Sequence, residues 1–415
     1  MPGRTKRATS VALAALLAVL AACSGNDRPA APTSNALIVV NVPLARAGVL
    51  ALQIRRGAEL AAAQINEAGG LNIGGRRVGL AVRVLDSGLS PEQSAANVRE
   101  AVRLGAVAVV DEGTGVDASY RIAAEVGLPI GIVYQGAGSL VDIATRRNVF
   151  RIAPTDRGVS FRLAEYIVPK KHRVAIITDD STYGAGGAAA LAKAFARNQS
   201  SIAIRLGVAA GATDLSAQIL RARRAGTTAL LVWARPPIVA QAVRDARGAR
   251  WNVRIFTAIS GGDPLVRQRL SDHPEWLDGM VFASSRLTAE KGPEPYQRFR
   301  AAYEQRFGAD RVGVRSGGKE VVQPPDQAMY SYDFVNVLGA ALEEAGEAKP
   351  GTKLLDALEF VSVHGANGDE RGFNERNHEG VVDDDVFFAV IRGMLWYPVK
   401  DDALSATLPD IPQTL

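Results

Sequence analysis

The stretch AVAVVDEGTGVDASYRIAAEVGLPIGIV, residues 106–133, is the clearest guide to the fold. It predicts a strand at Ala106–Val110, a helix at Ala118–Val126 and a second strand at Pro129–Val133. Both strands are short and continuously apolar, and the helix between them is amphipathic. This alternation indicates a βαβ unit and therefore a parallel sheet that is buried on both faces.

The same alternation continues on both sides of this stretch and predicts two series of βα units. The first series also contains Ala36–Val40, Val49–Glu67, Val78–Leu85 and Pro91–Leu104. The second contains Arg173–Thr178, Gly186–Asn198, Ile202–Leu206, Asp214–Ala225, Ala229–Trp233, Pro237–Gly248, Arg254–Thr257 and Gly279–Ala283. The C-terminal third adds helices at Pro295–Phe307, Ala328–Gly346 and Lys353–Phe360 and a strand at Val386–Ile391. Two series predict an α/β protein with two doubly wound parallel-sheet lobes.

The chain is expected to cross between the lobes three times, near Val149–Pro154, Phe282–Leu287 and Val361–Asn374. These crossings divide it into an N-terminal lobe and a C-terminal lobe. The N-terminal lobe comprises residues 36–152 and 286–362, and the C-terminal lobe comprises 153–285 and 363–415.

Composition excludes several other classes of protein. The 415 residues are 47% hydrophobic and 22% charged, so the chain is neither disordered nor fibrous. A single cysteine excludes an internal disulfide framework and a cysteine-rich zinc module. The 48 basic and 43 acidic residues nearly balance, which gives no electrostatic reason to expect nucleic acid.

The N-terminus has the plan of an export signal. Residues 1–22 combine a basic start with the apolar run Val11–Ala22, which is too short for a permanent membrane span. Leu20–Cys23 resembles a bacterial lipobox, in which Cys23 becomes the lipidated first residue of the mature protein. A plain signal peptide and a buried lone cysteine are the alternatives. Residues 23–35 are small, polar and proline-containing, as in a flexible tether.

Two glycine-rich loops of the first lobe are candidates for ligand binding. Ligands of open α/β sheets collect at the carboxyl ends of strands, and glycine lets backbone N–H groups approach an anionic oxygen. Ordinary turn chemistry is the alternative for either loop. The candidate residues are Gly113, Thr114, Gly115, Gly136, Ala137, Gly138 and Ser139.

The second lobe offers four further candidates at its strand ends. Tyr183 and Trp233 are expected to close over a ligand from the opposite side, with Ser260 or Asp263 adding polar contacts. Core packing is the alternative for Trp233, and simple exposure is the alternative for Tyr183.

Catalysis and cofactor binding have little support. The pattern Gly113-x-Gly115-x-x-Ala118 fits a loose dinucleotide fingerprint, but it lies on a later strand and lacks the expected acidic residue about twenty positions on. The chain has no GxSxG, HExxH or Walker sequence. The acidic run Asp383–Asp385 is typical of a solvated turn rather than of a cation site. We therefore expect no metal, no cofactor and no catalytic residue. The four histidines are expected at the surface: His172, His273, His364 and His378.

Several segments together resemble one family. They are Gly57–Ala61, Ile65–Gly70, Asp86, Ser90–Ala95, Gly127–Pro129, Phe150–Ile152 and Asp179–Gly184. In order and spacing they resemble the branched-chain amino-acid-binding proteins of ABC importers, from about Ala36 to the last strand. The resemblance implies a type I periplasmic binding fold, in which two lobes joined by three crossing segments clamp a ligand.

The resemblance also implies that the candidate loops contact the ligand. Leucine-binding members hold the ligand carboxylate with Ser or Thr hydroxyls, where this chain offers only Thr114 and Ser139. They hold the ammonium with an acidic residue near Ser260, where the chain has Asp263 a few residues on. The ligand is therefore expected to be a small polar metabolite: an amino acid, an amide or a small carboxylate.

The expected protein is an exported monomer, in the periplasm or at the cell surface, anchored through Cys23. It would deliver its ligand to the permease of an ABC transporter by hinge closure. A ligand-sensing receptor of the same fold is the alternative, and an exported enzyme is a third class.

Overall fold

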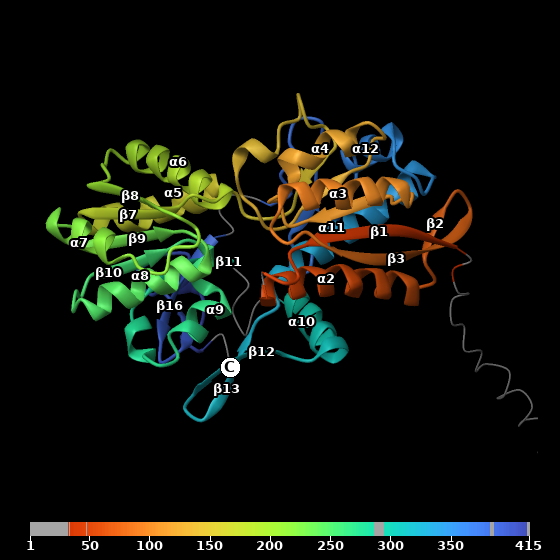
Figure 1. Cartoon of the computed structure of the whole chain (residues 1–415). Helices are drawn as coiled ribbons and strands as arrows, with labels where there is room; N and C mark the ends of the chain where they lie inside the picture. The colour runs from red at the N-terminus through yellow and green to blue at the C-terminus, as the bar shows by residue number, and fades with distance from the viewer. Residues whose placement is uncertain (1–31, 33, 47, 286–293, 382–385, 413–415) are drawn as a thin grey trace, which may run out of the picture.

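Two α/β lobes lie side by side, and each is built around one central sheet (Figure 1). The computed structural model describes residues 32, 34–46, 48–285, 294–381 and 386–412. The expected lipidation site, Cys23, and the acidic run 383–385 lie outside these residues. None of the described helices is long and apolar enough to cross a bilayer.

The first lobe contains a six-stranded sheet in the order β2-β3-β1-β4-β5-β6. Its strands are β1 (Ser34–Val42), β2 (Leu71–Ile73), β3 (Arg76–Asp86), β4 (Ala108–Asp111), β5 (Ile130–Ile132) and β6 (Val149–Arg151). All neighbours pair in parallel except β2, which is antiparallel to β3. Ile38 and Val40 of β1 enter the core on one face, and Val39 enters the core on the other. Burial of both faces explains why these strands are continuously apolar.

Helices cover both faces of the first sheet. One face packs against α2 (Gly48–Glu67), α11 (Asp326–Ala345) and α12 (Thr352–Leu358), with α10 (Glu294–Phe307) against α2, and the other face packs against α3 (Pro91–Arg103) and α4 (Val116–Ala124). The helices α2 and α11 approach closely because Gly57 has no side chain. A Cβ atom there would lie 2.0 Å from the carbonyl oxygen of Ala328.

The second lobe contains a seven-stranded sheet in the order β17-β16-β11-β10-β9-β7-β8. Its strands are β7 (Val174–Asp179), β8 (Ile204–Val208), β9 (Ala229–Trp233), β10 (Arg254–Thr257), β11 (Val281–Ser285), β16 (Val386–Arg392) and β17 (Leu395–Pro398). Pairing from β8 to β11 is parallel, whereas β16 and β17 add two antiparallel strands beside β11. Its helices are α5 (Asp156–Ile167), α6 (Thr182–Arg197), α7 (Ser216–Arg224), α8 (Pro236–Gly248) and α9 (Pro264–Arg269).

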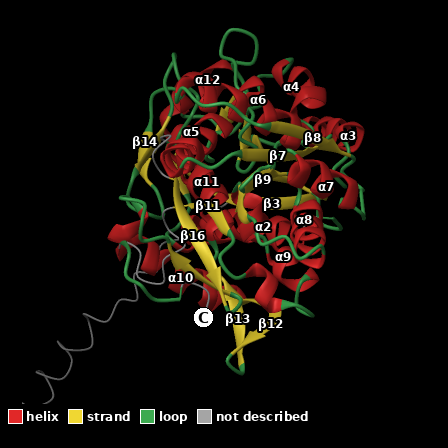
Figure 2. Ribbon diagram, turned by 90° about the vertical axis from the view of Figure 1, so that its left-hand side faces the viewer, coloured by secondary structure: helices red, strands yellow, loops and turns green. Residues whose placement is uncertain are grey.

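Two hairpins extend the βα framework. The hairpin β12 (Asp310–Ser316) and β13 (Lys319–Gln323) projects from the bottom of the molecule in Figures 1 and 2. Its Val312, Val314 and Val321 pack with Leu395 of the second lobe, while the side chains of Gln53 and Arg56 in the first lobe bond to Asp310. This hairpin therefore contacts both lobes.

The second hairpin consists of β14 (Ser362–His364) and β15 (Glu370–Gly372). It lies in the first lobe, which corrects one expected lobe boundary. We expected the second lobe to resume at residue 363. Instead Ala366 and Phe373 belong to the core of the first lobe, because the buried Arg371 and Asp333 join the hairpin to α11 through an ion pair of 3.1 Å. The chain returns to the second sheet only at β16.

Candidate functional site

A cavity of about 590 Å³ lies between the two lobes. The first lobe contributes residues from the loop before α2 and from the ends of β4 and β5. The second contributes the starts of α6, α8 and α9. This is the arrangement expected of parallel sheets, because the carboxyl ends of the strands and the amino ends of the following helices lie at the same edge.

The ends of β4 and β5 contribute Glu112, Thr114, Tyr134 and Gln135 to the first-lobe wall of the cavity. The Glu112 carboxylate accepts a hydrogen bond of 2.9 Å from the Thr114 backbone N–H, and the Gln135 side-chain amide donates to the Thr114 hydroxyl at 3.3 Å. The Gln135 backbone N–H also donates to the Glu112 carbonyl at 2.9 Å. These bonds tie the two strand-end loops together.

Gly113 makes the turn between these wall residues possible. Its φ of +114° lies in the region that side-chain-bearing residues rarely adopt. A Cβ atom at this position would lie 2.3 Å from the Cβ of Gln135. Glycine at position 113 therefore allows the backbone conformation of the loop and lets the Gln135 side chain pack directly against it.

Asp179 organises part of the second-lobe wall. One of its carboxylate oxygens accepts a 2.7 Å hydrogen bond from the Arg235 backbone N–H, and the other accepts bonds from the N–H and hydroxyl groups of Ser181. The Ser181 hydroxyl in turn accepts a 3.1 Å bond from the Gly184 N–H, which caps α6. A buried carboxylate thus positions Arg235 and the Ser181–Tyr183 segment at the cavity.

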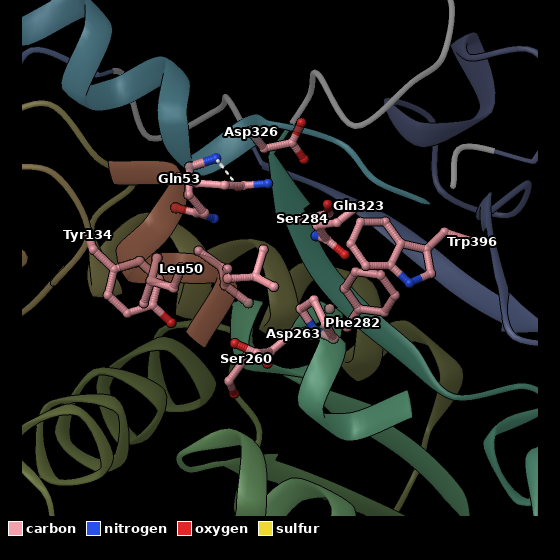
Figure 3. A pocket seen from close by; sticks show the side chains of 15 residues that line it. Leu50, Gln53, Tyr134, Ser260, Asp263, Phe282, Ser284, Gln323, Asp326 and Trp396 are labelled. Atoms are coloured by element: carbon pink, nitrogen blue, oxygen red, sulfur yellow. Dashed lines mark hydrogen bonds between the residues drawn. The ribbon is translucent and has the colours of Figure 1, made fainter. Parts of the chain in front are cut away.

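Asp263 forms the other part of that wall and caps α9 by accepting a 2.8 Å bond from the Leu265 N–H. It also lines a smaller adjoining chamber of about 40 Å³ between the lobes. Figure 3 shows Tyr134, Ser260 and Asp263 toward one side of this chamber and Gln323 and Trp396 toward the other. Tyr134 and Asp263 therefore belong to both spaces.

Acidic groups with raised pKa values surround this region. Burial, followed by the charge of the neighbouring Asp111, raises the pKa of Glu112 to about 7. Burial likewise raises the pKa of Asp263 to about 6, although Arg267 opposes the shift. Asp156, at the first crossing between lobes, has a pKa of about 7 for the same reason, with Arg151 opposing it. Perturbed groups of this kind gather where a protein binds ligands.

Four of the eleven expected site residues line the described cavities. Thr114 and Tyr183 line the large cavity, Ser260 lines the small chamber, and Asp263 lines both. The Tyr183 and Ser260 hydroxyls are buried and interact with each other, but neither makes a hydrogen bond of good geometry in the part of the chain that the structure describes. Both therefore keep hydrogen-bonding capacity for a ligand.

The glycines that we selected lie behind the wall. A Cβ atom on Gly115 would lie 2.0 Å from the Cβ of Ser94, and one on Gly136 would lie 2.5 Å from the carboxylate of Asp156. Both positions are close backbone packing contacts rather than part of the cavity lining.

The remaining four expected residues lie outside the lining of both cavities. Ala137 is buried in the first-lobe core, and its carbonyl accepts a bond from Arg151. Gly138 and Ser139 begin an exposed 3-10 turn. Trp233 is 1% exposed and packs under Tyr183, with ring centroids 5.7 Å apart. Its position matches the core-packing alternative.

Sequence reasoning missed several lining residues. Glu112, Tyr134 and Gln135 directly follow strands β4 and β5, and this position could have identified them. Arg235 follows β9 by the same distance as Tyr134 follows β5, whereas Arg46 carried no comparable signal. The surface prediction for His378 is wrong, because it is 1% exposed and stacks on Phe150 with ring centroids 4.1 Å apart. In the described parts of the chain, no group of three or more His, Cys, Asp or Glu residues could hold a metal ion.

Two lobes with a polar cavity between them define a solute-binding fold. Residues 46–393 match the periplasmic binding protein family, and the chain belongs to that family. Its members bind solutes and form no enzyme family.

Two curated relatives from Pseudomonas aeruginosa cover most of the chain. An amino acid binding protein is 28% identical over 323 residues, which is 75% of this chain and 78% of the relative. A leucine-, isoleucine-, valine-, threonine- and alanine-binding protein is 25% identical over 329 residues, with 78% and 81% covered.

Solved structures agree on the fold. A type 1 periplasmic binding protein from Bordetella pertussis superposes with a TM-score of 0.76 at 22% identity, covering 91% of this chain and all of that one. A branched-chain amino acid transporter substrate-binding protein from Streptococcus pneumoniae, solved with isoleucine, gives a TM-score of 0.72 at 18% identity, with 87% and 97% covered. The predicted type I periplasmic binding fold is confirmed.

Proposed function

We propose that this protein is the solute-binding component of an ABC importer and captures a small amino-acid-type solute between its lobes. The observation that carries the proposal is the cavity of about 590 Å³, which both lobes line with polar side chains. Such a cavity can bury most of the surface of a small molecule while a few polar groups fix its orientation.

The mechanism that fits this geometry is closure of the lobes around the solute. Thr114 and Tyr134 come from one lobe, whereas Tyr183 and Asp263 come from the other. A solute that contacts both walls gains more interactions when the lobes are close together, so its binding favours the closed arrangement. No bond is made or broken.

The names of the relatives support an amino-acid ligand, because both curated relatives are described as amino-acid-binding proteins. The N-terminal sequence supports export and anchoring through Cys23, since residues 20–23 resemble a lipobox. Delivery to a membrane permease follows from the family role and completes the proposal.

A thermal-shift screen of the mature chain tests this function. We expect at least one compound in a panel of amino acids, their amides and small carboxylates to raise the melting temperature, because a ligand that binds only the folded state stabilises it. The same compound should have little effect on Tyr183→Ala, which removes an aromatic side chain from the second-lobe wall of the cavity. A panel without any stabilising compound would contradict the proposal.

A further inference from the structure

The first-lobe wall of the large cavity is rich in buried hydrogen-bond acceptors. Glu112 is 2% exposed and Gln135 is 6% exposed, yet both line the cavity. The side-chain oxygen of Gln135 is buried and has no hydrogen-bond partner in the part of the chain that the structure describes. An unsatisfied buried acceptor is costly, so a donor supplied by the solute would be strongly favoured there.

The neighbouring donors are already engaged. The Thr114 N–H donates to Glu112, and the Gln135 side-chain nitrogen donates to the Thr114 hydroxyl. The nearby Arg151 donates to the carbonyls of Gln135 and Ala137 and forms an ion pair with Glu379. At the ends of β4 and β5 the wall therefore presents a carboxylate and an amide oxygen to the cavity, and the described basic side chains that line the cavity, Arg46 and Arg235, come from other segments.

The opposite wall adds to this excess of acceptors. Asp263 lines the cavity from the second lobe, and burial raises its pKa as it does that of Glu112. Carboxylates that are costly to ionise in an empty site become stable when a cation occupies it.

Basic side chains line a more exposed part of the same cavity. Arg46 comes from the loop before α2 and is exposed, whereas Arg235 lies before α8 and is half-buried. Neither arginine has an ion pair with another described residue. They come from different lobes, so an anionic group of the solute could contact both as the lobes approach.

Building on the function proposed above, we infer that Glu112 is a specificity-determining residue. With Gln135, it binds a cationic, hydrogen-bond-donating group of the solute, a guanidinium or an ammonium. The solute is therefore a basic amino acid whose side-chain cation lies against Glu112 and Gln135 and whose carboxylate lies toward Arg46 and Arg235. A charge-assisted bond to a buried carboxylate supplies the selectivity.

Isothermal titration calorimetry with matched pairs of compounds tests this inference. Arginine and citrulline are nearly isosteric but differ in charge, as do lysine and norleucine. We expect the wild type to bind the cationic member of at least one pair about tenfold or more tightly than its neutral partner. The variant Glu112→Gln keeps an acceptor for the Thr114 N–H. Its affinity for the cationic compound should fall about tenfold, whereas its affinity for the neutral partner should fall less than about threefold.

Glu125→Gln is the matched control, because Glu125 is exposed in the same lobe and outside the cavity lining. It should leave both affinities unchanged. Tighter or equal binding of the neutral partners by the wild type would overturn the inference, as would an equal loss for both partners in Glu112→Gln.

The panel also separates this inference from the proposed function. If neutral amino acids bind and the cationic ones do not, the proposed function stands and the assignment of Glu112 fails. If no compound of either kind binds, the proposed function itself fails, and this inference fails with it.

Discussion

At the residue scale, the position of a side chain after a strand was not enough to decide whether it reaches the cavity. Tyr183 and Trp233 both lie at strand ends of the second lobe. Tyr183 lines the cavity and Trp233 packs beneath it. The difference depends on the loop conformation, because Trp233 is still part of β9 and faces α6, where Gly187 leaves room for its ring.

The same limit applies to the first lobe. The sequence placed both glycine-rich loops after strands of the first lobe, and in the structure hydrogen bonds from Gln135 to Glu112 and Thr114 join the two loops. It could not predict that Gly115 and Gly136 pack against Ser94 and Asp156, because these partners are distant in the sequence. Thr114 and Glu112 reach the cavity instead.

The raised pKa of Glu112 predicts an effect on stability. A carboxyl whose pKa rises from about 4.5 to about 7 on folding binds its proton more tightly in the native state. Its contribution therefore favours folding at low pH and is lost as the pH rises through this interval. Glutamine is neutral throughout, so the melting temperature of Glu112→Gln relative to the wild type should become more positive between about pH 5 and about pH 8.

Melting curves of the two unliganded proteins across this pH range measure the difference. Asp111 and Tyr134 also interact with Glu112, but both are present in wild type and variant. Glu125→Gln, at an exposed site, should give a flat difference. A flat or falling difference for Glu112→Gln would contradict the assigned pKa shift.

At the scale of elements, the alternation of strands and helices was predictable and the irregular additions were not. The expected strand Ala229–Trp233 and helix Pro295–Phe307 agree closely with β9 and α10. Helix α5 was missed, because no element was expected between the crossing Val149–Pro154 and the strand Arg173–Thr178, although Thr155 caps the helix through a 2.9 Å bond from the Gly158 N–H. The two added hairpins interrupt the regular alternation of strands and helices. They are held by contacts with residues that are distant in the sequence.

The hairpin β14–β15 offers a prediction on stability. Asp333 on α11 and Arg371 on the hairpin are both about 1% exposed or less, and the carboxylate also accepts a 2.6 Å bond from the Ala366 N–H. Asp333→Ala removes the nearer of the two carboxylates that pair with the buried Arg371, the other being Asp369 at 3.9 Å, and should cost about 3–5 kcal/mol of unfolding free energy. Urea denaturation measures this cost.

An exposed ion pair provides the control for this substitution. Asp272 bonds to Arg244 at 2.8 Å, but its side chain is 56% exposed. Asp272→Ala should therefore cost no more than about 1 kcal/mol. Equal losses for the two variants would show that the buried pair does not hold the hairpin to α11.

At the scale of the whole molecule, the two-lobe architecture could be predicted because each series of βα units buries its own sheet. The two lobes have separate cores, on both faces of each sheet. The shape of the space between them could not be predicted. It depends on how Tyr134 and Leu50 of one lobe approach Asp263 and Pro264 of the other.

The structure of the mature chain in complex with the solute that most raises its melting temperature is the most direct test. The proposed function predicts density for one solute molecule between the lobes, in contact with Glu112 or Tyr134 on one side and with Tyr183 or Asp263 on the other. Density only in the separate surface cavity of the first lobe, lined by Phe299, Tyr332 and His364, would contradict it.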